Sequence, residues 1–485
     1  MLQNKKDTNE RLLEVQAKYT IEELTGQKVE GEAKISLTTN ALSISPKFND
    51  PILLSLRDIT KIEFKDYKIA LFLFPNGIIV ISELGYQYEN VAKHLTKARN
   101  EIILKDLLMS ESIKKSGLLG EIVSPEISGN CEVRLYSTAL VILPDQGELI
   151  RIPYGTMKKI EEKDFALLIQ TDDGAEYKLL KFGEKFKILT NSLAKELNDL
   201  SLMVQGSVKD MMPSASPVLA QQLAAIMKEG KATTKQEIEK VSPEFWQALL
   251  AQLKALGVKE NYDFLDALDQ TQSVSIGVKR GLMGGLTGDY LWFLIPICVV
   301  GSQKIGNVIA MEATSPNQKG KATYFFKITD RKDYAKLKTP EEVENQAKQV
   351  MKIINACMVK INFRREPIIV PTEKLNNPKY EKYKFAITKI PELQILRSLY
   401  VGKVIHTSLE QWKQDVEELL AFNLASQDNS MRWVKVREGM TDEDIEKEIE
   451  ADEVFAENQA EISLSPETNI DLDKIKQDGQ PSANN

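Results

Sequence analysis

A repeated string of seven residues constrains the fold of this chain more than any other feature. The string KIEFKDY at 61–67 returns as KIEEKDF at 159–165, an offset of 98 residues. The same offset aligns further pairs: Gly31 with Gly129, Ile35 with Val133, Leu37 with Leu135, Leu42 with Leu140, and Ile69 with Leu167. A one-residue slip would turn every strand side chain to the opposite face, so the shared register indicates two units that bury the same face. The sequence therefore predicts an internal duplication.

Each unit begins with short apolar runs of the two-residue period that is typical of half-buried strands. The period then changes after Gly85 and after Gly183. The residues that follow have helical spacing: Tyr88, Val91, Leu95, Ala98 and Ile102 in the first unit, and Phe186, Leu189, Leu193, Leu197 and Leu200 in the second. Each unit is predicted to contain about six or seven strands and one terminal amphipathic helix.

A unit of this order resembles the pleckstrin-homology-like (PH-like) superfold, including its GRAM type. The resemblance covers residues 20–205 and implies two tandem PH-like β-barrels, each closed by a C-terminal helix. In lipid-binding members of that fold, basic residues gather in the loop between the first two strands. The loops assigned to that place here, Thr38-Thr39-Asn40 and Tyr136-Ser137-Thr138, contain no Lys or Arg. This departure argues against a clamp for a phosphoinositide headgroup.

Four lysines recur at equivalent places around the repeated string: Lys61, Lys65, Lys159 and Lys163. They could contact an anionic membrane surface. Lysine is also the usual guard against edge-to-edge pairing of strands, and the sequence favours this reading.

Six segments are predicted from the composition and the repeat. They are a flexible lead-in at 1–19, PH-like domains at 20–110 and 120–205, a linker and helical connector at 206–270, an α+β domain at 271–436 and an acidic disordered tail at 437–485. In the connector, Ser242-Pro243 supplies a cap for a helix that carries Trp246, Leu249 and Leu253. This apolar stripe is expected to pack on its own domain, with a partner helix as the alternative.

The α+β assignment rests on the order of elements after residue 271. Apolar strands are expected at Tyr290–Val299, Asn307–Ala313 and Ala322–Ile328, close enough together to pair antiparallel. Thr339-Pro340-Glu341-Glu342 then predicts a capping box at the start of a helix. Two more helical stretches follow, near Pro378–Val401 and Leu409–Phe422. Strands followed by helices favour an α+β domain with an antiparallel sheet.

Composition indicates a cytoplasmic protein. The longest apolar run, Tyr290–Val300, is about half the ~20 residues that a membrane-spanning helix needs, and the first residues do not resemble a secretory signal. Cys131, Cys298 and Cys357 are too scattered for a disulfide framework. The 15 acidic and 4 basic residues from Arg437 onward give a net charge of −11, which leaves +4 for residues 1–436 out of the total of −7. Such a tail disfavours phosphate-rich partners.

No motif identifies a reaction, and no catalytic residue, metal or cofactor is predicted. The glycine-rich stretch 281–288 lacks the ending of a P-loop and the spacing of a dinucleotide fingerprint. The only two histidines, His94 and His406, are far apart in sequence, which excludes a histidine-rich metal site and leaves a nucleophile–histidine pair open. Arg364 and Arg365 are the candidate binding residues. They are expected either to pair with carboxylates or to bind an anion.

Three functions remain open, and an enzyme is the less favoured class. The leading prediction is a non-enzymatic binding or scaffold protein that presents its PH-like domains to a protein partner. The first alternative is peripheral membrane association through the repeats. The second is a small-ligand sensor or enzyme that uses the α+β domain, with Arg364, Arg365 and Trp292 at its site. Nucleic acid is disfavoured, because no basic tract is interleaved with aromatic residues.

Overall fold

The described residues fold into three antiparallel sheets and the helices that join and cover them, which is an α+β arrangement. In this computed structural model the described residues are 11–22, 28–108, 112–268, 273–280, 289–298, 307–315, 322–330, 333, 336–337, 339–426 and 431–435. The predicted glycine-rich stretch 281–288 and acidic tail 437–485 lie outside them. No helix among the described residues combines the length and apolar character needed to cross a membrane.

The first module, residues 11–108, is a seven-stranded sheet followed by a long helix, α1 (Tyr88–Leu108). Its strands lie in the order β4-β3-β2-β1-β7-β6-β5. They are β1 (Arg11–Glu22), β2 (Lys28–Thr38), β3 (Ala41–Pro46), β4 (Ile52–Ser55), β5 (Ile59–Lys65), β6 (Lys68–Leu73) and β7 (Ile78–Ser82). The apolar stripe of α1 that includes Val91, Leu95 and Ala98 covers the concave face and completes one core.

The second module, residues 113–211, repeats this arrangement strand for strand. Its strands are β8 (Ile113–Val123), β9 (Ser128–Tyr136), β10 (Ala139–Pro144), β11 (Ile150–Pro153), β12 (Met157–Lys163), β13 (Ala166–Thr171) and β14 (Glu176–Leu180), and its helix is α2 (Phe186–Met211). From β3 to β7 each strand has a counterpart with both bounds displaced by 98 residues. The structure therefore has the periodicity that the sequence predicted.

The repeated string forms a hairpin in both modules, with two residues at the turn that have a left-handed backbone. The φ angles are 51° and 58° at Asp66 and Tyr67, and 50° and 56° at Asp164 and Phe165. Positive φ at both central residues is the geometry that matches the twist of a two-residue hairpin. Each turn aromatic packs edge-on against the first residue of its helix, with 5.5 Å between the ring centroids of Tyr67 and Tyr88. The string is therefore a structural element of the fold.

The prediction of a flexible lead-in at 1–19 is wrong for residues 11–19, because residues 11–22 form a strand, β1. β1 pairs with both β2 and β7, so it lies in the middle of the sheet. Val15, Ala17 and Tyr19 alternate into the core. Long polar residues between them, and the small side chain of Ala17, concealed this two-residue period in the sequence.

Two further expectations about the modules are corrected: the position of the loop at residues 38–40 and the closure of each sheet into a barrel. The Thr38-Asn40 loop joins the second and third strands, not the first two. The first loops are 23–27, which lies outside the described residues, and 124–127; neither contains Lys or Arg. The predicted closure into barrels is not found, because the hydrogen-bonded order ends at β4 and β5 in the first module and at β11 and β12 in the second. A short 3-10 turn, Leu56–Asp58 in the first module, links these edges.

The third sheet is six-stranded, and its strands lie in sequence order. They are β15 (Thr233–Thr234), β16 (Ser275–Arg280), β17 (Asp289–Ile297), β18 (Val308–Thr314), β19 (Ala322–Lys327) and β20 (Tyr400–Ile405). β17, β18 and β19 match the three predicted strands to within two residues. β20 was not predicted: the expected helix near Pro378–Val401 is broken by Pro391 and ends where this edge strand begins.

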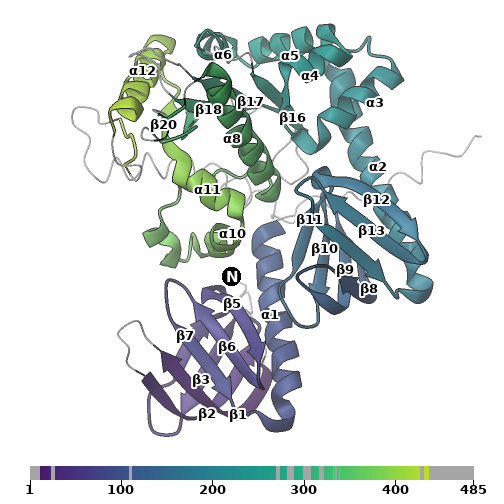
Figure 1. Cartoon of the computed structure of the whole chain (residues 1–485), viewed down its shortest axis with the longest axis vertical. Helices are drawn as coiled ribbons and strands as arrows, with labels where there is room; N and C mark the ends of the chain where they lie inside the picture. Colours follow the sequence, from purple (N-terminus) through teal and green to yellow (C-terminus); the bar gives the residue numbers. More distant parts are fainter. Residues whose placement is uncertain are drawn as a thin grey trace, which may run out of the picture.

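Helices cover both faces of the third sheet. One face packs on α3 (Pro217–Ile226), α4 (Lys235–Val241), α5 (Pro243–Ala255), α6 (Lys259–Asp266) and α12 (Leu409–Ala425). The other packs on α8 (Pro340–Lys360), α9 (Glu366–Ile369), α10 (Lys384–Lys389) and α11 (Pro391–Leu399). The helices of the predicted connector thus share a core with the C-terminal sheet, and Trp246 is buried there and not offered to a partner helix. Figure 1 shows α1 standing between the two modules, with the third sheet and its helices above them.

Candidate functional site

The predicted pair Arg364 and Arg365 lies in the turn that follows α8, beside two residues of left-handed backbone, Asn362 and Phe363. The guanidinium carbon of Arg365 lies 5.1 Å from the centre of the Tyr324 ring. The Arg364 side chain is half-buried and forms no ion pair with another described residue, so the internal ion pair expected for it is not found. Their predicted role in binding stays a prediction.

One polar junction in the described residues is built around α1, which packs against the second module as well as against its own. Ile103 and Leu104 of α1 form a small core with Tyr136, Val141, Leu143 and Leu149 of the second module. Tyr136, Val141 and Leu143 lie on the outer face of the second sheet, and Leu149 lies in the loop before β11; none of them belongs to that module's own core. This outer face therefore recognises a helix.

The loop 145–149 of the second module adds polar contacts to this apolar patch. The Asn100 side chain donates to the Gly147 carbonyl (3.1 Å) and accepts from the Leu149 amide (3.3 Å). Gln146 donates to Glu89 (2.7 Å), and Lys93 lies 3.4 Å from Asp145. Side chains along α1 thus fix the position of one loop.

Arg99 of α1 joins three parts of the chain and is only 2% exposed. Its guanidinium donates to the carbonyls of Ile59 (3.0 Å) and Thr60 (2.9 Å) in the first module, and to Glu148 (3.1 Å) in the second. Its central carbon also lies 5.6 Å from the centre of the Phe385 ring in α10. Burial lowers the pKa of Arg99, although Glu148 opposes this shift.

A second ion cluster ties the first module directly to the C-terminal domain. Arg57 makes two hydrogen bonds to Asp106 (2.7 and 2.9 Å) and one to Glu381 (3.1 Å). Lys384 pairs with Asp58 in the same region. The hydrogen bond with Asp106 raises the pKa of Arg57, whereas burial raises the pKa of the Asp106 carboxyl. The two modules and the C-terminal domain are therefore fixed relative to one another by buried and half-buried charges.

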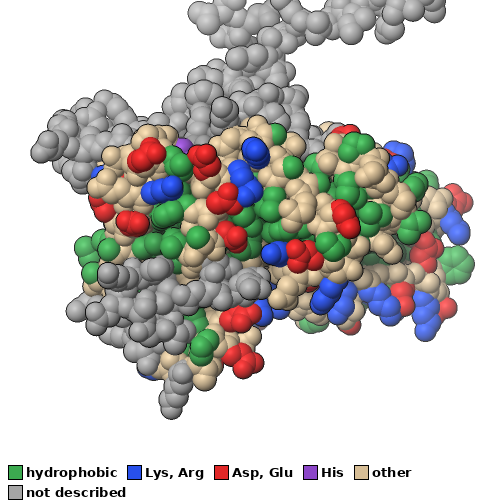
Figure 2. Space-filling model, turned by 90° about the horizontal axis from the view of Figure 1, so that it is seen from above, with side chains coloured by type: hydrophobic (Ala, Val, Ile, Leu, Met, Phe, Trp, Pro, Cys, Tyr) green, Lys and Arg blue, Asp and Glu red, His purple; other side chains and the backbone are tan. Residues whose placement is uncertain are grey.

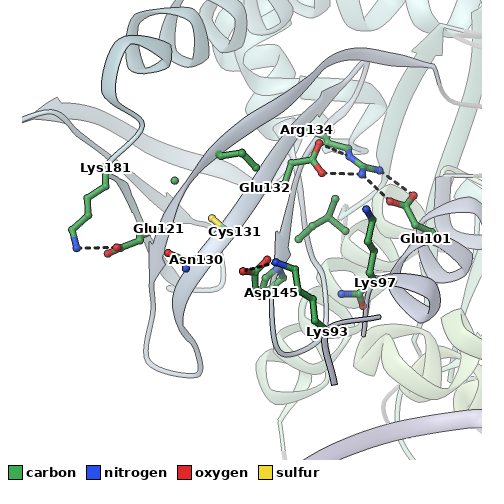
Figure 3. A pocket seen from close by; sticks show the side chains of 15 residues that line it. Lys93, Lys97, Glu101, Glu121, Asn130, Cys131, Glu132, Arg134, Asp145 and Lys181 are labelled. Carbon is green, nitrogen blue, oxygen red and sulfur yellow. Dashed lines mark hydrogen bonds and ion pairs between the residues drawn. The ribbon is translucent and has the colours of Figure 1, made fainter. Parts of the chain in front are cut away.

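A groove of about 630 Å³ lies where α1 diverges from the second sheet, and charged side chains line it (Figure 3). Most of these charges are paired with one another. Arg134 makes two hydrogen bonds to Glu101 and two to Glu132, between 2.7 and 3.0 Å, and Lys181 pairs with Glu121 at 2.8 Å. The hydrogen bonds from Arg134 lower the pKa of Glu132.

The groove contains one cysteine, Cys131, among its lining residues. Burial raises the pKa of the Cys131 thiol to about 12, so this cysteine is neutral near pH 7 and not an activated nucleophile. Figure 3 shows Arg134 between Glu101 and Glu132, with dashed contacts to both carboxylates. Figure 2 views the molecule from above. On the described surface that it shows, acidic and basic side chains are interspersed, and neither charge forms a patch of its own.

The surface of the first module that corresponds to the α1-binding surface is open. Val141 and Leu143 of the second module are replaced by Ser43 and Ser45, which are half-buried. Leu53 stands in place of Arg151 and is 75% exposed. Phe48 stands in place of Gln146 and is 89% exposed. We call these four residues of the first module (Ser43, Ser45, Phe48 and Leu53) the open surface.

Arg151 shows what the open surface lacks. It donates to the carbonyl of Lys360 (3.1 Å) and to the side chain of Asn362 (2.9 Å), so the β11 edge is covered by the turn after α8. Leu53 has no group that could make such bonds. Leu53 and Phe48 are large apolar side chains exposed on this module, and exposed apolar patches are a frequent mark of interaction sites.

Sequence reasoning missed both Arg99 and the open surface. Arg99 lies four residues after Leu95 and four before Ile103, a spacing that places it on a packed face of α1. The pattern of β10 was also visible, since all six residues of Ala139–Pro144 are apolar and all are buried. The equivalent Ala41–Pro46 alternates. This contrast was available from the two aligned repeats.

Comparisons with known proteins add little. No family model matches the chain, and no curated protein matches it. One similar solved structure is described as "Structure of the Spt16D Pob3N heterodimer", with 13% sequence identity, coverage of 34% of this chain and 87% of that chain, and a TM-score of 0.14. A TM-score this low carries no argument about fold or function.

Proposed function

We propose that this chain is a non-enzymatic binding or scaffold protein, in which two PH-like modules are held rigidly and the first offers its open surface to a protein partner. The observation that carries the proposal is the contrast between equivalent surfaces. The second module uses this surface to bind α1 and the turn after α8, whereas the first exposes Phe48 and Leu53 there.

The chemistry of the open surface suits a protein partner that binds reversibly. Fully burying one Leu or Phe side chain contributes about 1.5–3 kcal/mol, so Phe48 and Leu53 can supply two anchors. The serines beside them keep the surface wettable when no partner is bound, because their hydroxyl groups can hydrogen-bond to water. Apolar anchors at a polar surface are typical of interfaces whose partners also exist apart.

The rigid junction supports the scaffold part of the proposal. Arg99 and the Arg57–Asp106 cluster fix the first module against the remainder of the described chain. A surface that is held in one orientation loses less conformational entropy when a partner binds.

The partner can be found by crosslinking in the native host. Phe48, Leu53 or Tyr86 of the full-length chain is replaced, one at a time, by a photo-crosslinking amino acid. Tyr86 is the matched control, because it lies in the same module and is 93% exposed. We expect the same protein adduct from positions 48 and 53 and none from position 86.

Binding to the purified partner then tests the surface directly. Leu53→Asp should weaken binding at least about tenfold, since truncating a hot-spot residue of an interface costs about 2 kcal/mol or more. Tyr86→Ser should bind like the wild type. Equal binding by all three proteins would contradict the proposal. Co-sedimentation of the full chain with anionic vesicles, lost in Leu53→Asp, would support the membrane alternative instead.

A further inference from the structure

A buried carboxylate in the third sheet has a set of partners that the proposed function does not use. Glu312 on β18 is 0% exposed. Ala310 and Phe325 are buried in the core beneath α12, and Glu312 and Thr323 lie two residues further along the same face of their strands. His406 directly follows β20, and Trp412 on α12 covers the cluster. Three strands and one helix thus bring four polar side chains together at one end of the sheet.

Three of these side chains place their donor atoms in a tight triangle. Thr323 Oγ1 lies 2.8 Å from Glu312 Oε2 and 3.1 Å from His406 Nε2. The third side, between His406 Nε2 and Glu312 Oε2, measures 3.2 Å. The Trp412 indole donates to Thr323 Oγ1 from outside the triangle, at 3.3 Å.

The charge of Glu312 is the unusual part of this cluster. Among the described residues its only polar partners are Thr323 and His406, and neither carries a permanent positive charge. Its second oxygen, Oε1, is buried and has no hydrogen-bond partner in the part of the chain that the structure describes. A buried carboxylate that has no permanently charged neighbour among the described residues and keeps one unsatisfied oxygen is costly, and such groups are commonly neutralised by an ion pair or a metal.

We propose that Glu312, Thr323 and His406 bind one first-row divalent metal ion through Oε2, Oγ1 and Nε2. Metal–ligand bonds of about 2.0–2.2 Å put neighbouring donor atoms roughly 3 Å apart, which the observed triangle already satisfies. The metal would also place a permanent positive charge beside Glu312, and Oε1 could then accept from metal-bound water. A donor set of imidazole, carboxylate and hydroxyl suits ions such as Zn²⁺ and Mn²⁺ better than a soft thiolate-seeking ion.

The protons balance without any other reactant. His406 binds the metal as neutral imidazole, with its proton on Nδ1. Glu312 is ionised, and Thr323 keeps its proton, which turns away from Oε2 when the metal takes that position. The Trp412 indole remains an outer donor to Thr323 and orients the hydroxyl. This site lies in the C-terminal domain and is independent of the open surface.

Metal analysis of the purified full-length chain tests the proposal. The protein is stripped with a chelator, incubated separately with zinc and with manganese, desalted, and assayed for bound metal and for its melting temperature. We expect one more equivalent of one of these metals in the wild type than in Glu312→Gln or His406→Gln, and a rise in melting temperature that both variants lose. Trp412→Phe should weaken binding roughly tenfold, as loss of outer-shell partners does.

His94→Gln is the matched control, because His94 is the chain's other histidine and lies on α1. It should behave like the wild type, which separates the proposed site from nonspecific binding to histidine. The proposal is wrong if the wild type retains neither metal, or if Glu312→Gln retains as much as the wild type. Because the first of these outcomes needs no variant, the test does not depend on how well the substituted proteins fold.

Discussion

The two modules share one fold but differ in what their outer faces touch. In the second module the outer face packs on α1, and β10 is apolar at every position. In the first module the same face is open, and β3 alternates apolar and hydroxyl residues. A sheet covered on both faces needs continuous apolar strands, whereas a sheet covered on one face needs alternation. The residue pattern of each duplicated strand therefore indicates whether one or both faces of its sheet are covered.

Exchanging these residues gives the largest expected effect. Val141→Ser with Leu143→Ser gives the second module the residues of the first and should lower the free energy of unfolding by about 4–6 kcal/mol, because two buried apolar side chains are lost beneath α1. Urea unfolding measures this loss. The reverse exchange, Ser43→Val with Ser45→Leu, should change stability by less than about 1 kcal/mol and instead promote self-association. Equal destabilisation by both pairs would contradict the comparison.

Removal of the buried guanidinium between the modules should have the next largest effect. Arg99→Leu introduces the residue that α2 carries at the equivalent position, Leu197. It leaves the Ile59 and Thr60 carbonyls without their donor, and we expect a loss of about 3 kcal/mol in thermal or urea unfolding. Lys97→Leu, an exposed change on the same helix, is the control. If Arg99→Leu unfolds like this control, Arg99 does not hold the junction.

The smallest expected effect is on the decline of stability at low pH, and it should be confined to the second module. The pKa of Glu132 is lowered in the folded state, chiefly by Arg134. Its ionised form therefore stabilises the fold above the carboxyl's ordinary pKa, and this contribution is lost as the pH falls through the lowered value. Glu132→Gln should reduce stability near pH 7 by about 1 kcal/mol and flatten the decline in acid. Lys34→Gln, at the equivalent place in the first module, should leave that decline unchanged.

Much of the fold could be predicted from the sequence, because the repeat shows the apolar pattern of the module strands in two aligned copies. The helix stripe from Tyr88 and the capping box at Thr339 have the predicted structure, and β17, β18 and β19 match the predicted strands to within two residues. β1 was missed because its buried positions include the small Ala17 among long polar residues. β20 was missed because a single edge strand after helices has no alternating partner nearby in sequence.

The candidate sites were harder to predict, since each depends on contacts between distant segments. Arg99 meets Glu148 and Phe385 only after three parts of the chain have come together. Glu312, Thr323 and His406 are separated by up to 94 positions, and only the pairing of β18, β19 and β20 unites them. Arg364 and Arg365 stood out in the sequence because they are adjacent, yet adjacency does not show what a side chain will face.

The junction on α1 also sets how many modules the chain can stack. A further module could pack on α2 as the second module packs on α1 only if α2 carried the same contact residues. In α2, however, Leu197 replaces Arg99 and Lys187 replaces Glu89. At the other end, Pro51 replaces Leu149 and has no amide proton for an asparagine to accept. Terminal repeats with altered faces are what stops a solenoid from growing. Neither end of the pair therefore carries the residues that form its internal contact, and we expect copies of the chain not to build a filament by repeating that contact.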